Sequence, residues 1–179
     1  ANFIFTAIGG VEILEYRAGG LVTFNDADVG LGHIAKIIAD GNANHLEVSD
    51  SAVDLSDLTF VGWNENQGAA PLDVVFVSGT GNGDALTGSV KADIINAFAG
   101  DDVVDGGDGG DTIYPDLGQD SVDGGNGDDI INYDDGDEIE SGELIDGGIG
   151  NDILRITETA TGEIYDFSTA VMSGLETLL

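Results

Sequence analysis

GGDGGDTIY (106–114) and GGNGDDIIN (124–132) decide how this chain folds. Each stretch is nine residues long, opens with a glycine-rich turn, and has aspartate at position six and isoleucine at position eight. Counting in steps of nine gives six contiguous units over 79–132, and a further unit follows at 147–155. The position-six residues are Asp84, Asp93, Asp102, Asp111, Asp120, Asp129 and Asp152. A strict short period predicts stacked structural repeats rather than an irregular acidic loop.

Position eight of every unit is aliphatic. The members are Leu86, Ile95, Val104, Ile113, Val122, Ile131 and Leu154. Six turn residues followed by three extended residues predict a short strand whose middle side chain points inward. Two units then complete one coil, so each unit is expected to stack on the second unit after it, about 4.8 Å away.

The period is interrupted once, between 133 and 146. We expect a degenerate unit, YDDGDEIES (133–141), with Glu138 at position six. Five extra residues, 142–146, would then precede the unit that begins at Gly147. The repeat block as a whole is predicted to span 79–155.

The two flanks, 1–78 and 156–179, have a different texture. Short β-branched and aromatic stretches at 22–24, 46–48, 58–61 and 74–77 predict strands. Residues 33–38 fit either a strand or one helical turn. Asp-Leu-Ser at 54–56 and Gly-Trp-Asn at 62–64 align without gaps with 166–168 and 174–176, so both flanks are predicted to contain the same β-rich unit.

Charge limits the partners of this chain. The 35 acidic and 4 basic residues give a formal net charge of −31, which opposes folding through self-repulsion. Nucleic acid and anionic membranes are disfavoured for the same reason, and no apolar stretch is long enough for membrane insertion. Cysteine is absent, which excludes thiolate metal sites. Bound metal cations or a halophilic, solvated surface would each accommodate the excess charge.

Stacking brings the position-six carboxylates of successive coils into files. Two such charges 4 Å apart repel by about 1 kcal/mol in water and by several times more at lower effective dielectric. A hard divalent cation between them replaces the repulsion with coordination. Calcium takes six to eight oxygen ligands at about 2.3–2.6 Å, including carboxylates and backbone carbonyls, and suits such a site better than magnesium does.

The block resembles the RTX (repeats-in-toxin) family of calcium-binding nonapeptide repeats, G-G-x-G-x-D-x-U-x, most clearly at 106–114, 124–132 and 147–155. The resemblance implies an all-β, right-handed parallel β-roll, a β-solenoid, that binds several Ca²⁺ ions, flanked by short-strand segments. It also implies a bacterial protein that is secreted by a type I system and resides outside the cell or on its surface. Metal ligands implied by the resemblance are Asp84, Asp93, Asp102, Gly106, Asp108, Asp111, Asp120, Gly124, Asn126, Asp129, Gly147 and Asp152.

The units do not match the motif equally well. Those beginning at 88, 106, 124 and 147 form one column, and those at 79, 97, 115 and 133 form the other. The column with units at 88, 106, 124 and 147 is closer to the consensus than the second column, with units at 79, 97, 115 and 133. The sites of Asp111 with Asp129 and of Asp129 with Asp152 are therefore expected to bind calcium best. Lys91 disfavours a site between Asp93 and Asp111, and Pro115 disfavours sites in the second column.

Other site types lack their motifs. No segment has the ligand spacing of an EF-hand, and no nucleophile motif accompanies His33 and His45, the only two histidines. We therefore expect no enzymatic activity. The sequence predicts a calcium-dependent structural module of a large secreted or cell-surface protein, such as an adhesin or surface-layer component. An accessory module of a secreted enzyme or toxin is the alternative. Extracellular polysaccharide and neighbouring repeats of the same protein are the candidate partners besides calcium.

Overall fold

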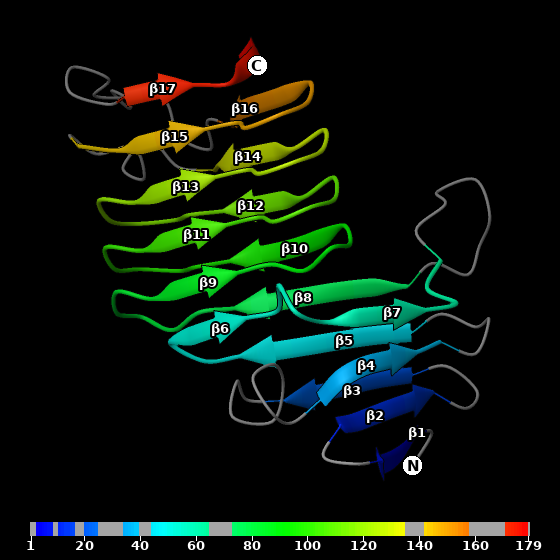
Figure 1. Cartoon of the computed structure of the whole chain (residues 1–179). Coiled ribbons are helices and arrows are strands. Elements are labelled where there is room, and N and C mark those ends of the chain that lie inside the picture. The colour runs from blue at the N-terminus through cyan, green and yellow to red at the C-terminus, as the bar shows by residue number, and fades with distance from the viewer. Residues whose placement is uncertain are drawn as a thin grey trace.

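The computed structural model describes residues 3–8, 11–16, 20–24, 34–39, 44–64, 73–134, 142–157 and 171–178. Within these ranges the protein is all-β: the strands form sheets that are mostly parallel, and none closes into a barrel. The same residues contain no helix that could cross a membrane. The expected fold class, a parallel β-roll or solenoid, is confirmed (Figure 1).

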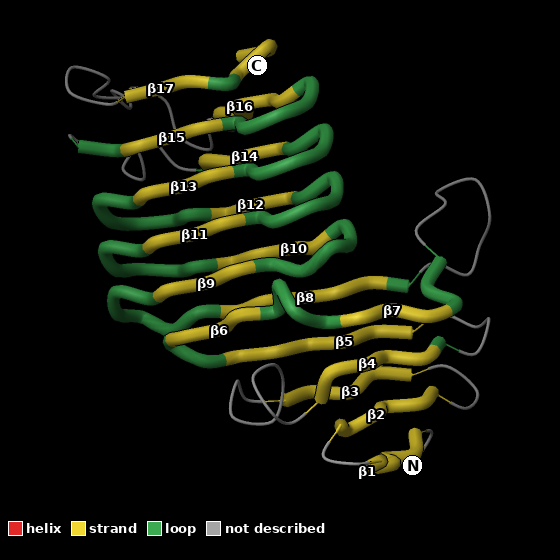
Figure 2. The backbone as a smooth tube through the Cα atoms, in the orientation of Figure 1, coloured by secondary structure: helices red, strands yellow, loops and turns green. Residues whose placement is uncertain are grey.

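Two parallel sheets face each other along the length of the molecule, and the chain alternates between them through turns at their two edges (Figures 1 and 2). The larger sheet runs in the order β18 (Leu175–Leu178), β16 (Asp152–Ile156), β14 (Ile130–Tyr133), β12 (Thr112–Tyr114), β10 (Asp93–Asn96), β8 (Val74–Ser78), β5 (Asn44–Ser49) and β3 (Gly20–Phe24). The smaller sheet runs in the order β17 (Val171–Ser173), β15 (Leu144–Asp146), β13 (Ser121–Asp123), β11 (Val103–Asp105), β9 (Ala85–Thr87) and β6 (Ala52–Asp54).

The strand register confirms the expected stacking of each unit on the second unit after it. Ile95 pairs with Ile113 in one sheet, and Val104 pairs with Val122 in the other. Identical positions of the repeat therefore lie in straight files, one coil above the next. This register also places every turn of one column at the same edge of the sheets.

Within the nonapeptide block, the core between the two sheets is built by the position-eight side chains. They are at most 3% exposed. They form one file in each sheet, and their members are Leu86, Ile95, Val104, Ile113, Val122, Ile131 and Leu154. Burying one such side chain contributes about 1.5–3 kcal/mol, so the repeated aliphatic position is the main apolar source of stability within this block.

The sheets extend beyond the nonapeptide block. β5 and β8 pair with each other, and β8 pairs with β10, so the larger sheet continues without a break across Gly79. A further sheet in the order β1 (Phe3–Ile8), β2 (Val11–Tyr16), β4 (Ile34–Ile38) and β7 (Thr59–Val61) lies at the N-terminal end. Residues 34–38 are thus a strand, which settles the choice left open by the sequence.

In both flanking segments the second aligned triplet begins with a glycine whose backbone is left-handed. Gly62 has φ +73° and Gly174 has φ +65°. The shared backbone conformation agrees with the alignment of 62–64 with 174–176. The earlier half of the second copy, 166–168, lies outside the described residues.

The expected register of the interruption is wrong. β15 consists of Leu144–Asp146, which we had expected to be extra residues, and it pairs with β13 so that Val122 faces Ile145. Glu143 therefore occupies position six, and Glu138 lies outside the described residues. The physical reason is burial: Ile145 is 1% exposed and continues the core file, so the extra length precedes this strand instead of following it.

Candidate metal centre in the turns

The position-six aspartates are buried at the two edges of the roll. All seven, Asp84, Asp93, Asp102, Asp111, Asp120, Asp129 and Asp152, are at most 4% exposed. Each of these residues lies where a turn ends and the next strand begins, and its side chain points into the space between successive coils. Burial of an acidic side chain is costly unless its oxygens find donors or a cation.

One carboxylate oxygen of most of these residues has a structural role. Asp111 Oδ1 accepts a hydrogen bond from the backbone N–H of Asp93 at 2.8 Å, and Asp129 Oδ1 accepts one from the N–H of Asp111 at 2.7 Å. Asp152 does the same for Asp129 at 2.9 Å. The other edge has an equivalent series, in which Asp102 binds the N–H of Asp84 and Asp120 binds that of Asp102. The aspartate file is therefore a ladder of caps linking each coil to the previous one.

The second oxygen of several of these carboxylates has no donor. The Oδ2 atoms of Asp102, Asp120, Asp129 and Asp152 are buried and accept no hydrogen bond from any described residue. A buried, unsatisfied carboxylate oxygen costs at least 1–3 kcal/mol, roughly, and a full negative charge costs more. These four atoms are the oxygens that a bound cation would satisfy.

Backbone oxygens converge on the same places. A Cβ atom built on Gly106 would lie 2.3 Å from the carbonyl oxygen of Gly124 and 2.7 Å from Asp111 Oδ2. At Gly124 the corresponding distances are 2.4 Å to the carbonyl oxygen of Gly147 and 2.8 Å to Asp129 Oδ2. The carbonyl oxygens of Gly124 and Gly147 accept no hydrogen bond within the described part of the chain. At Gly124, two oxygens without donors, Asp129 Oδ2 and the carbonyl oxygen of Gly147, thus lie close to the same point. Carboxylate and carbonyl oxygens are the donor set that calcium prefers.

The pKa values of several position-six aspartates are raised by their burial. Burial raises the pKa of Asp120 to about 8, and the charge of Glu143 adds to the effect. Burial also raises the pKa of Asp129 to about 6, with a contribution from the charge of Asp152. The pKa values of Asp102 and Asp152 are raised for the same primary reason. The folded structure therefore favours a proton or a metal ion on these carboxylates over a bare negative charge.

Two of the predicted ligands lie away from the buried carboxylates. Asp108 and Asn126, at position three, are exposed on the outside of their turns. The Asn126 amide donates to Asp108 Oδ1 at 2.7 Å, so the pair links two coils. The glycines predicted as ligands, Gly106, Gly124 and Gly147, by contrast lie beside the buried carboxylates and offer carbonyl oxygens.

The carboxylates of a file do not gather into a cluster. No group of three or more histidine, cysteine, aspartate or glutamate side chains in the described ranges is arranged to hold a metal ion. A cation in these turns would therefore depend on backbone carbonyls for most of its ligands. This requirement agrees with the free carbonyl oxygens of Gly124 and Gly147 and with the shortage of carboxylates per turn.

Comparison with known proteins adds nothing to the geometry of these turns. No protein-family model, no curated protein and no solved structure matches this chain.

Sequence reasoning missed three acidic residues that continue the cap ladder. Glu143 binds the N–H of Asp120 at 3.3 Å and accepts from the buried Tyr133 hydroxyl at 2.9 Å. Glu176 binds the N–H of Asp152 at 2.6 Å, and Asp73 binds that of Asn44 at 2.8 Å. None of these residues lies in a unit that matches the motif, so only the strand register could have identified them.

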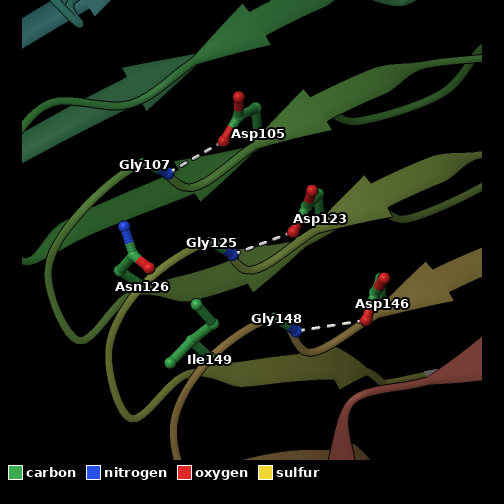
Figure 3. Close-up of a pocket in the computed structure, with 8 residues that line it drawn as sticks. All are labelled: Asp105, Gly107, Asp123, Gly125, Asn126, Asp146, Gly148 and Ile149. Carbon is green, nitrogen blue, oxygen red and sulfur yellow. Dashed lines mark hydrogen bonds between the residues drawn. The ribbon is translucent and has the colours of Figure 1, made fainter.

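A second acidic file, at position nine, was also missed. Asp105, Asp123 and Asp146 line a shallow groove along one edge of the roll, together with turn glycines (Figure 3). Their carboxylates accept hydrogen bonds from the N–H groups of Gly107, Gly125 and Gly148 at 3.0, 3.0 and 3.2 Å. Aspartate at position nine of two units, Asp105 and Asp123, was a visible signal in the sequence, whereas the place of Asp146 follows from the strand register and the role of all three from these bonds.

Proposed function

We propose that the chain is a calcium-binding structural module, and that calcium stabilises its β-roll by binding between successive turns. The observation that carries this proposal is the buried Oδ2 atom without a donor, present in Asp102, Asp120, Asp129 and Asp152. The resemblance of 106–114, 124–132 and 147–155 to RTX repeats supports calcium as the cation and a secreted or cell-surface protein as its context.

Electrostatics supports a folding switch. The chain carries a formal net charge of −31, and its buried carboxylates have raised pKa values. At neutral pH without metal, folding must bury several repelling charges or protonate them. Extracellular modules bind calcium with dissociation constants of roughly 10⁻⁴–10⁻³ M, so the low calcium of a cytosol would leave the turns empty and millimolar calcium would fill them. A site with a dissociation constant of about 10⁻⁴ M, held at about 1 mM calcium, contributes about 1.4 kcal/mol to folding.

Unfolding by urea in EGTA, in CaCl₂ and in MgCl₂, followed by far-UV circular dichroism, tests the proposal. We expect the urea midpoint to rise strongly in calcium and only weakly in magnesium. Asp129→Asn removes a buried charge from a turn, and Asp57→Asn removes an exposed charge of the same sign as a matched control. The calcium-induced rise should shrink in Asp129→Asn and persist in Asp57→Asn. Equal midpoints in EGTA and calcium for the unsubstituted protein would exclude a calcium-dependent fold.

The cap ladder favours a second candidate, a purely structural solenoid. Each Oδ1 atom already binds a backbone N–H, which alone explains an acidic residue at position six. In that case protonated carboxylates, not calcium, would occupy the interior. The same urea series separates the two, because the urea midpoint of a purely structural solenoid would not change with calcium.

A further inference from the structure

The N–H group of position two binds one of two alternative acceptors, and the choice divides the turns into two classes. In the first class the N–H binds the position-six carboxylate of its own unit. Thr80 N–H donates to Asp84 Oδ2, and Ser89 N–H donates to Asp93 Oδ2. The hydroxyls of Thr80 and Ser89 also donate to Oδ1 of the same aspartates, each at 3.0 Å. Protein donors thus reach both oxygens of these two carboxylates.

In the second class the N–H of position two points away from the aspartate. It donates to the side chain at position nine of the preceding unit, as Gly125 does to Asp123 at 3.0 Å (Figure 3). Phe98 donates to Asn96 in the same way at 3.2 Å. The four donors of this class are Phe98, Gly107, Gly125 and Gly148. All four have left-handed backbones, with φ between +71° and +94°.

The class of a turn correlates with two sequence positions. Ser78 and Thr87 stand at position nine before the turns of the first class, and a hydroxyl residue stands at position two. Asparagine or aspartate stands at position nine before every turn of the second class. The turn at 115–120 has Tyr114 at position nine and still adopts a left-handed backbone at Asp116, with φ +68°.

Among the turns of the two classes, unsatisfied carboxylate oxygens follow the same division. Asp102, Asp129 and Asp152 lie in turns of the second class, and their buried Oδ2 atoms have no donor. Asp120 Oδ2, which also has no donor, lies in the turn at 115–120, which has the left-handed backbone without an asparagine or aspartate at position nine. Asp84 and Asp93 lie in turns of the first class, and their Oδ2 atoms accept from the N–H of Thr80 and Ser89. Turning the position-two N–H outward is therefore what frees a carboxylate oxygen for a cation.

We infer that the position-nine residues Asn96, Asp105, Asp123 and Asp146 are positioning residues for calcium, and that Thr80 and Ser89 replace calcium in the first two turns. This inference rests on the proposed function. The position-nine side chains hold the turn in its left-handed form without touching the cation. The turns at 79–84 and 88–93 are complete without metal, so the adjacent strands β9 and β10 provide a preformed coil on which the calcium-dependent coils stack.

The positioning role is tested by calcium titration calorimetry on three variants of the full chain. Asp123→Ala removes the acceptor, Asp123→Asn keeps an acceptor oxygen without the charge, and Asp57→Ala is a charge-matched control on the exposed surface. Loss of a residue that orients a metal site weakens affinity by about 10–100-fold. We expect one site weakened by about tenfold in Asp123→Ala and changed less than about twofold in the other two. Equal weakening in Asp123→Asn and Asp123→Ala would assign Asp123 to direct coordination or to charge, and overturn positioning.

Amide hydrogen exchange in EGTA tests the metal-free turns. We expect β9 and β10 to be protected in EGTA, while β14 and β16 gain protection only when calcium is added. The double variant Thr80→Ala/Ser89→Ala should lose the EGTA protection of β9 and β10 and bind the same number of calcium ions. Uniform exchange of all four strands in EGTA would overturn the inference. If the unsubstituted protein binds no calcium, the proposed function fails by itself, and the exchange pattern in EGTA still decides whether these two turns are self-sufficient.

Discussion

At the scale of single residues, glycine has two different roles in these turns. Gly127 has φ +148°, and a Cβ atom there would lie 1.2 Å from the carbonyl oxygen of Gly109 in the previous coil. Gly124 has no left-handed backbone, but a Cβ atom would still meet the carbonyl oxygen of Gly147 at 2.4 Å. Close contact between coils, as well as backbone conformation, therefore dictates glycine in the repeat.

Substitution of Gly127 by alanine should strongly destabilise the roll. The change forces an unfavourable φ and a steric clash with backbone that cannot move freely, so we expect a loss of about 3 kcal/mol or more. Gly81→Ala is the matched control, because nothing lies within 4 Å of its Cβ position. Urea unfolding of both variants in calcium measures the difference. A near-neutral Gly127→Ala would mean that the coils are not packed as closely as described.

The buried carboxylates predict an unusual pH dependence for the metal-free protein. The pKa of an aspartate in an unfolded chain is about 3.9. Burial in the folded chain raises the pKa of Asp129 to about 6 and that of Asp120 to about 8. The folded state then binds more protons than the unfolded state, so stability is greatest below about pH 4 and falls until about pH 8. Calcium should reverse the trend, since protons compete with metal for the same oxygens.

Urea midpoints in EGTA and in calcium, measured between pH 4 and pH 8, check this dependence. The midpoint should fall with rising pH in EGTA and rise with pH in calcium. A midpoint in EGTA that is flat or rises over this range would contradict the raised pKa values.

At the scale of elements, successive coils are joined by acidic side chains. Each of these side chains accepts a hydrogen bond from a backbone N–H of the preceding coil. The cap ladder on the larger sheet runs from Asp93 to Glu176, and a further cap, Asp73 on Asn44, lies before the nonapeptide block and two residues out of register with it. The consensus units revealed its middle part because aspartate recurs at position six. Asp73 and Glu176 lie in segments without the motif, and so does Glu143 at the interruption. The pairing of β15 with β13 and the burial of Ile145 show that Glu143 stands at position six. Sequence spacing cannot locate an insertion when both alternatives contain acidic residues.

Removal of the last cap should loosen the C-terminal end of the larger sheet. In Glu176→Ala the N–H of Asp152 loses its acceptor, which costs about 1–2 kcal/mol of local stability, so the exchange rate of this amide should rise about tenfold. Glu176→Gln keeps an oxygen in reach and should change the rate much less. Hydrogen exchange read at single residues by NMR distinguishes the variants. Identical rates in both would show that the hydrogen bond does not protect the end of the sheet.

At the scale of the whole molecule, the nine-residue period was sufficient to predict the parallel roll, the stacking of alternate units and the aliphatic core. The period could not reveal that the larger sheet continues through β8, β5 and β3, because these strands lie outside the nine-residue repeat. It also could not separate the two classes of turns, since that difference lies in which acceptor the position-two N–H binds. The candidate ligands were predictable as residue types, whereas only the three-dimensional arrangement of the turns identifies the oxygens that lack a donor.

A crystal structure of the protein grown in millimolar CaCl₂ shows whether cations bind between the turns. We expect anomalous calcium density beside Asp129 Oδ2 and the carbonyl oxygen of Gly147, with ligand distances of about 2.3–2.6 Å. Equivalent density should follow the second-class turns and be absent beside Asp84 and Asp93. Turns without density at Asp129 and Asp152, in a roll folded as described, would contradict cation binding between the turns.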